Sequence, residues 1–457
     1  MYRHLLLGSL ITTLAGCASM SAETKSATSH LQAAERSGHV AIETVASAEA
    51  PLVFITEARI MTAAGEIHER GYIAMANGRI EAVGAGAPPS TDGAHVIAAP
   101  GMVVTPGLID THSHLGVYPA PSAKAHSDGN EMTTPITAGV WAEHAFWPQD
   151  PGIQRALMGG VTTLMALPGS GNLIGGRGVT LHTVPRRGSR AMRYPGAPDG
   201  VKMACGENPK RVYGTRNSSP QTRMGNLYVQ RSAFIDAVEY KKKLDKAEAP
   251  KRDLKLETLV GLMEGELLGH VHCYRADDMI NMLQLADEFG FKIRSFHHAV
   301  EAYKIRDILA ERDVSVSTWA DWWGFKMEAY DAIQENAALL SEAGGMPIIH
   351  SDSARGIRRL NQEAAKAMAH GRRAGIEISD NEALRWITYN AAWALGIEED
   401  VGTLEPGKRA DIVVWDGSPF SVYSSARWVF IDGALRHDSK GASVPWSDFE
   451  VGHEVQP

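Results

Sequence analysis

Between residues 105 and 396 the chain alternates short apolar runs with amphipathic stretches, and this alternation constrains the fold more than any other feature. Strands that alternate with helices build parallel βα units, and a barrel of such units typically takes about 250 residues. We therefore predict an α/β fold, a TIM-like (β/α)8 barrel over residues 105–399. The apolar runs that read as strands are residues 107–110, 161–165, 201–204, 269–272, 292–296, 314–317 and 346–350.

Shorter strand patterns occur on both sides of this region. On the N-terminal side they cover residues 52–55, 71–75 and 79–83, with an Asn-Gly turn at Asn77. A matching pair lies near the C-terminus. The sequence therefore predicts that residues 51–104 and 400–440 combine in a small β-sandwich domain, and that residues 441–457 form a tail.

The first seventeen residues differ from the rest. Arg3 and His4 precede an apolar stretch that ends in Leu-Ala-Gly-Cys, with the cysteine at position 17, and this order is typical of a signal peptide. The ending resembles the lipobox of bacterial lipoproteins, in which the cysteine is lipidated. The resemblance implies a lipid anchor on Cys17, a flexible tether over residues 18–50, and a location in the cell envelope, at the outer membrane facing the periplasm.

Charge and composition restrict the partners. The chain has 45 basic and 53 acidic residues, a net charge of -8, and no long basic block, so we expect no nucleic-acid partner. No internal apolar run is long enough to span a membrane, which leaves the lipid anchor as the expected membrane contact. We expect a small-molecule or short-peptide substrate; the sequence does not indicate the oligomeric state. Cys205 and Cys273 are expected to be small core residues and not a disulfide.

The strongest chemical signal is a histidine pair at His112 and His114, directly after the apolar run that begins at Gly107. Side chains two apart on a strand face the same way, so both imidazoles can face one cation. Two imidazoles form half of a zinc coordination shell.

Residues 105–114 resemble the first barrel strand of the amidohydrolase superfamily, and residues 402–411 resemble its connector back to the β domain. The likeness extends over residues 52–437. Residues 202–211 and 272–278 are most similar to the imidazolonepropionase-like and prolidase-like branch.

This resemblance implies a centre of two divalent metals, zinc by preference. His272 and His298 match the next two histidine ligands, and Asp352 matches the aspartate that follows the last strand. His297 adjoins His298 and could exchange roles with it; His298 is preferred for its spacing to Glu301. The bridging ligand has two candidates: Lys202, carboxylated by carbon dioxide, is favoured over Glu207.

The same resemblance implies a mechanism in which a metal-activated hydroxide attacks a polarised carbonyl and Asp352 carries the proton to the leaving nitrogen. Substrate contacts are expected from residues in loops and strand ends, where barrel enzymes concentrate them. These are Tyr213, Arg223, Tyr274 and Arg275.

The preferred function is therefore metal-dependent cleavage of a C–N bond in an amide, a dipeptide, an N-acyl amino acid or a cyclic amide. A deaminase on the same fold is the alternative, but deaminases of the superfamily carry a His-x-x-Glu motif after the fifth strand. Here Ala276, Asp277 and Asp278 occupy that region. A non-catalytic binding lipoprotein is the third reading, and loss of ligands would be its signature.

Overall fold

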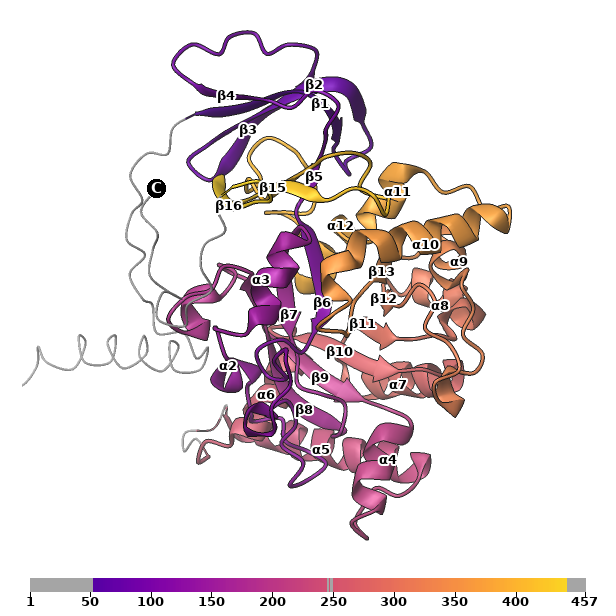
Figure 1. The fold of residues 1–457 in the computed structure, drawn as a ribbon. Coiled ribbons are helices and arrows are strands. Elements are labelled where there is room, and N and C mark those ends of the chain that lie inside the picture. The colour runs from indigo at the N-terminus through magenta and orange to yellow at the C-terminus, as the bar shows by residue number, and fades with distance from the viewer. Residues whose placement is uncertain (1–51, 245, 247–249, 442–457) are drawn as a thin grey trace, which may run out of the picture. The chain divides into compact units, whose positions relative to one another are not determined.

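A computed structural model describes residues 52–244, 246 and 250–441. Its centre is an eight-stranded, nearly closed barrel whose strands follow one another in sequence order (Figure 1). The strands are β6 (Leu108–Ser113), β7 (Val161–Ala166), β8 (Ile174–His182), β9 (Gly200–Ala204), β10 (Leu268–Cys273), β11 (Ile293–His298), β12 (Ser315–Thr318) and β13 (Pro347–Ile349).

The third barrel strand departs from the predicted parallel arrangement. β8 runs antiparallel to both β7 and β9, whereas the remaining neighbours along the barrel pair in parallel. Only residues 167–173 connect β7 to β8, too few for the crossover that a parallel pair requires. The sequence did not predict β8 at all.

α-Helices connect the strands that pair in parallel, and α7 illustrates why they form. It spans Ala276–Phe289, the range that the sequence predicts, and its apolar stripe of Met279, Met282, Leu283 and Ala286 is buried. Gly290 ends it in the left-handed conformation, with φ of 74°. The other α-helices are α2 (Ala142–Ala145), α3 (Pro151–Met158), α4 (Glu207–Gly214), α5 (Arg223–Leu244), α6 (Leu254–Glu264), α8 (Arg306–Glu311), α9 (Asn336–Glu342), α10 (Leu360–Arg373), α11 (Asp380–Arg385) and α12 (Tyr389–Leu395).

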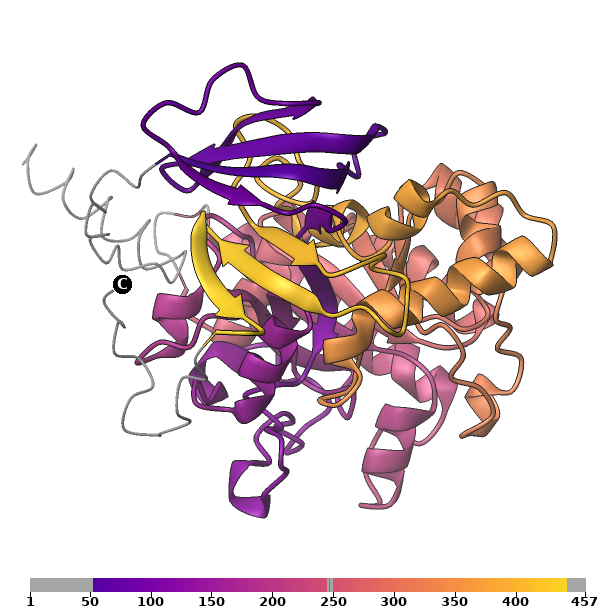
Figure 2. The same cartoon turned by 45° about the horizontal axis from the view of Figure 1, so that its top comes forward.

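Both flanks of the barrel contribute to a second sheet. Its path is β16-β15-β14-β5-β1-β2-β3, with β4 paired to β1. Figure 2 shows the N-terminal strands in indigo beside the C-terminal ones in yellow. The strands are β1 (Val53–Met61), β2 (Ile67–Ala76), β3 (Arg79–Ala85), β4 (His95–Ala98), β5 (Val103–Pro106), β14 (Ile412–Trp415), β15 (Ala426–Ile431) and β16 (Ala434–Asp438).

The predicted β-sandwich is not confirmed. β5 pairs with β14, with Thr105 opposite Val413, so hydrogen bonds join the strands of both flanks in one sheet. Cys17, the signal peptide, the tether and all but the first residue of the predicted tail lie outside the described residues. Among those described, no helix is long and apolar enough to cross a membrane.

Candidate metal centre and active site

The first two predicted ligands come from one strand. His112 lies in β6 and His114 follows it, and the alternation of side chains brings their Nε2 atoms to 3.3 Å. The Nδ1 atom of His114 lies 2.8 Å from the carbonyl oxygen of Leu167. Since a carbonyl oxygen can only accept, Nδ1 of His114 carries the proton and Nε2 keeps its lone pair for a metal.

Asp352 approaches the same point from the segment after β13. Its backbone N–H donates to the carbonyl oxygen of His112 at 3.0 Å, and its φ of 44° lies in the left-handed region. Its Oδ1 is 3.4 Å from Nε2 of His114 and 3.7 Å from Nε2 of His112. A strained backbone at this position fits a side chain held in place for function.

Asp110 holds the segment that carries Asp352 against β6. Its carboxylate accepts hydrogen bonds from the backbone N–H groups of His112 and Ser351, at 3.1 Å each, and from the Ser351 hydroxyl. Burial raises the pKa of Asp110 to about 6. This contact links β6 to the segment that carries Asp352.

Lys202 completes the cluster from β9. Its side chain is buried, and its Nζ lies 3.4 Å from Nε2 of His112 and 3.0 Å from the carbonyl oxygen of Pro168. Burial lowers the pKa of Lys202, and the nearby Asp352 carboxylate partly offsets this. Burial raises the pKa of the Asp352 carboxyl, and the positive charge of Lys202 partly offsets this rise.

The separations of these atoms suit a divalent cation. A tetrahedral zinc site with bonds of about 2.0–2.1 Å places neighbouring ligand atoms about 3.3–3.4 Å apart. The Nε2 atoms of His112 and His114 and Oδ1 of Asp352 lie 3.3–3.7 Å from one another, and Nζ of Lys202 lies 3.4 Å from Nε2 of His112. The donor set therefore fits a metal ion by chemistry and by distance.

A second group of histidines lies beside this one. The ring of His272, from β10, is 4.6 Å from the ring of His298, from β11, between centroids. Ligand atoms of His112, His298 and His350 lie within 4.8 Å of one another. Among the residues that the structure describes, Nδ1 of His272, Nδ1 of His298 and both ring nitrogens of His350 have no hydrogen-bond partner, so this group contains buried ring nitrogens that are unsatisfied.

Sequence reasoning did not select His350 or His270. His350 lies two residues before Asp352, and His270 two before His272, the same spacing that identified His112 and His114. Burial lowers the pKa of these rings and of the other histidines of the cluster, and the Lys202 cation adds to the effect at His350 and His270. The rings are therefore neutral, the form that binds metals.

Aromatic side chains form one wall of the cluster. Trp319, just after β12, stacks on His298 at 4.4 Å and on Trp322 at 4.9 Å, while Tyr274 stacks on His298 at 5.2 Å. Nζ of Lys326 lies 3.8 Å from the centre of the Tyr274 ring. Tyr274 is thus the predicted substrate residue that the structure places against the histidines.

The other predicted contacts lie differently. Arg275 pairs with Asp277 at 2.7 Å in a half-exposed position. The buried Tyr213 has its hydroxyl 2.6 Å from the carbonyl oxygen of Thr134 and 2.7 Å from that of the Asn172 side chain. Both arrangements occupy their polar groups within the protein.

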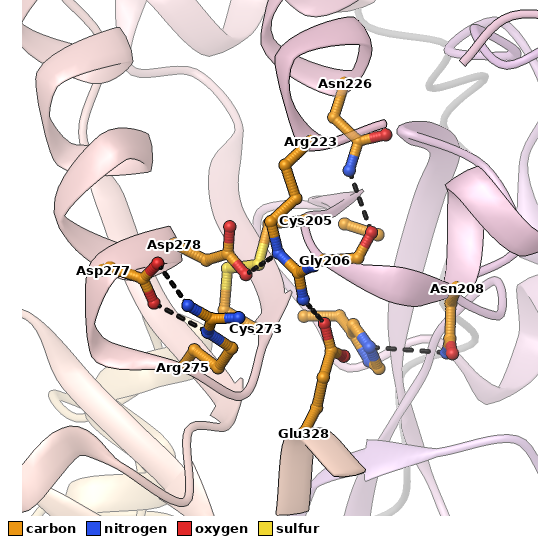
Figure 3. Close-up of a disulfide and its surroundings, with 12 residues drawn as sticks. Cys205, Gly206, Asn208, Arg223, Asn226, Cys273, Arg275, Asp277, Asp278 and Glu328 are labelled. Carbon is orange, nitrogen blue, oxygen red and sulfur yellow. Dashed lines mark hydrogen bonds and ion pairs between the residues drawn. A yellow bond between two sulfur atoms is a disulfide. The ribbon is translucent and has the colours of Figure 1, made fainter. Parts of the chain in front are cut away.

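Glu207 and Arg223 belong to a network of charges. Glu207 begins α4, and its carboxylate lies 3.3 Å from Nζ of Lys326, whereas Lys202 lies against His112. Arg223 begins α5 and pairs with Asp278, at 2.9 Å, and with Glu328. Figure 3 shows Arg223 between these two carboxylates.

A disulfide joins Cys205 to Cys273, and this corrects the expectation that both are isolated core residues (Figure 3). Ala204 pairs with His272 in the parallel β9–β10 ladder, and the N–H of Cys205 donates to the His272 carbonyl oxygen. The residues that follow these two, Cys205 after β9 and Cys273 at the end of β10, therefore lie side by side, with Cα atoms 5.3 Å apart.

Comparisons with known proteins relate the chain to amidohydrolases. The model of the amidohydrolase family matches residues 329–438. The structure of an amidohydrolase from Thermotoga maritima MSB8 is similar, with a TM-score of 0.78 and 35% sequence identity, over 84% of this chain and all of that one.

Two curated relatives are also similar. The amidohydrolase tasK of Hapsidospora irregularis is 34% identical over 81% of this chain, and the match spans only 39% of that relative's length. An imidazolonepropionase of Sphingopyxis alaskensis is 25% identical over 80% of this chain and 92% of its own length. More distant relatives, at 23% identity, include deaminases.

Proposed function

Because the chain belongs to the amidohydrolase family, we propose that it is a metal-dependent hydrolase that cleaves a C–N bond in an amide, a dipeptide, an N-acyl amino acid or a cyclic amide. One observation carries the proposal: nitrogen and oxygen atoms of His112, His114 and Asp352 lie 3.3–3.7 Å from one another beside Lys202, close to the spacing of ligands around one zinc ion.

In this proposal the cluster holds two zinc ions. His112, His114 and Asp352 would hold one ion, His272 and His298 would hold the other, and Lys202 would supply the anionic ligand that the two ions share. When bound, such cations supply Lewis acidity, which lowers the pKa of a water and polarises a carbonyl.

Lys202 bridges as a carbamate. Its neutral amine adds through the Nζ lone pair to the carbon of carbon dioxide and releases a proton, which leaves an anionic carboxylate on Nζ. Burial supports this step because it lowers the pKa of the amine and so favours the reactive neutral form. Carboxylation of the amine also removes the cost of a buried ammonium group. Glu207 stays the alternative bridge, with its pairing to Lys326 against it.

Asp352 is the proton carrier. It would take the proton from the attacking water and return it to the leaving nitrogen, a role that suits a carboxylate at the edge of the cluster. Tyr274, packed on His298, has the best support among the expected substrate contacts.

We also propose that the enzyme is exported and anchored through Cys17 at the outer membrane. The Cys205–Cys273 disulfide supports export, because disulfides persist in oxidising compartments.

Metal analysis of the wild type and of the Lys202→Ala, Glu207→Ala and Asp352→Asn variants, together with a substrate screen, tests the proposal. Wild type should contain two metals and cleave members of a panel of dipeptides, N-acyl amino acids and lactams. Lys202→Ala should lose one metal and most activity, with partial rescue by short carboxylates. Asp352→Asn should keep much of its metal but lose turnover.

Two results would change this assignment. If Lys202→Ala kept two metals and full activity while Glu207→Ala lost them, Glu207 would be the bridge. If the wild type released ammonia from aminated heterocycles and cleaved no amide, the deaminase reading, which the 23%-identical relatives favour, would replace ours.

A further inference from the structure

Three buried histidines from three strands form a continuous chain of hydrogen bonds that ends on a proposed metal ligand. Nδ1 of His112 lies 2.9 Å from Nδ1 of His297, and Nε2 of His297 lies 2.9 Å from Nδ1 of His270. His297 comes from β11 and His270 from β10, while His112 belongs to β6. We infer that His297 and His270 are positioning residues that fix the tautomer and the ring orientation of His112.

The direction of the chain follows from the chemistry of imidazole. A neutral ring has one N–H donor and one acceptor nitrogen. If Nε2 of His112 binds a metal, its proton sits on Nδ1 and is donated to Nδ1 of His297. His297 then carries its own proton on Nε2 and donates it to Nδ1 of His270. One ligand contact therefore determines the tautomers of three residues.

The far end of this chain supports a role at the metal rather than in general stability. The tautomer order leaves a proton on Nε2 of His270, and that nitrogen has no hydrogen-bond partner among the described residues. A polar chain with an unsatisfied buried end is a poor way to stabilise a core. It does, however, hold the His112 ring from behind, as hydrogen-bond partners of metal-binding histidines do.

His114 provides a contrast within the same site. Its Nδ1 is held by the backbone oxygen of Leu167, which side-chain substitution leaves in place. His112 instead depends on the side chain of His297, so its tautomer can be altered by mutation. The two neighbouring ligands should therefore differ in their sensitivity to changes behind them.

This inference rests on the proposed metal site, and zinc binding tests it independently of activity. The metal-free protein and its variants would be titrated with Zn²⁺ against a chromophoric chelator, and the absorption spectrum of the Co²⁺-loaded protein would report ligand geometry. His297→Phe removes the acceptor, and we expect zinc affinity to fall about 10–100-fold with an altered cobalt spectrum. His297→Asn keeps an acceptor near the position of Nδ1 and should restore most of the affinity.

A second pair of variants and one control separate positioning from folding. His270→Phe should weaken zinc binding less than His297→Phe, because it acts one ring further away, and His270→Asn should restore it. His182 in β8 is also buried but is not part of the hydrogen-bonded series His112–His297–His270, so His182→Phe should leave zinc affinity unchanged. Thermal unfolding of each variant would be measured alongside.

The outcomes are distinct. If the wild type binds zinc and the Phe variants of His297 and His270 bind it equally well, the inference is wrong. Equal losses in His297→Phe and His297→Asn, in step with lost thermal stability, would also overturn it in favour of a packing role. A wild type that binds no zinc would overturn the metal site itself and this inference with it.

Discussion

The disulfide should contribute a large part of the stability of the folded chain. Cys205 and Cys273 are 68 residues apart, and the loop between them carries α4, α5 and α6. Cross-linking restricts the unfolded chain, and the chain-entropy relation for a loop of this length gives about 4 kcal/mol. Since typical domains are stable by about 5–15 kcal/mol, reduction should lower the urea midpoint strongly.

Urea unfolding followed by tryptophan fluorescence measures this loss. The oxidised wild type, the reduced wild type and the Cys205→Ala/Cys273→Ala double variant would be compared, with thiol titration to verify reduction. The reductant should have no effect on the double variant, which is the matched control. If the verified reduced wild type unfolds with the same free energy as the oxidised form, then the loop-closure reasoning is refuted.

Two further outcomes are expected. Wild type should partition with detergent and the membrane fraction, whereas Cys17→Ser should be released or misprocessed; a wholly soluble, unlipidated wild type in its native host would remove the anchor. Burial raises the pKa of Asp411 from 3.8 to about 7, so its ionised form opposes folding and wild-type stability is lost as the pH rises across that range. Asp411→Asn should therefore be more stable than wild type at pH 8, by up to about 4 kcal/mol, with a smaller gap at pH 5; equal thermal unfolding shifts at both pH values would contradict this.

Where periodicity was clear, the sequence predicted the elements of the barrel. The apolar stripe of α7 gave its bounds, and seven apolar runs coincide with barrel strands. β8 was missed because it is buried along its whole length and so lacks polar alternation, and because Gly175, Gly176 and Gly178 separate Ile174 from its other β-branched residues, Val179 and Thr180. Its antiparallel direction depends on a short connection that has no pattern of its own.

The choice between His297 and His298 shows a different limit. Strand alternation sends one of two neighbouring residues into the barrel and the other outward. In the structure His297 contacts His112 and His270, yet His298 also reaches the cluster, because it and Ala299 have φ values of 70° and 37°. A left-handed conformation at a residue other than glycine has no clear sequence signal, so alternation alone could not show that both histidines lie in the cluster.

The cysteine pair could have been found from the ligands themselves. Lys202 and His272 were both expected at the same end of neighbouring strands, which restricts the register of β9 against β10 to a few alternatives. The observed register pairs Lys202 with His270 and Ala204 with His272, and continuing it by one residue sets Cys205 opposite Cys273. A shared site at the strand ends therefore carries information about register, and register decides which cysteines can pair. The sequence-based expectation for the two cysteines failed because it treated each by composition, apart from the strands that carry the ligands.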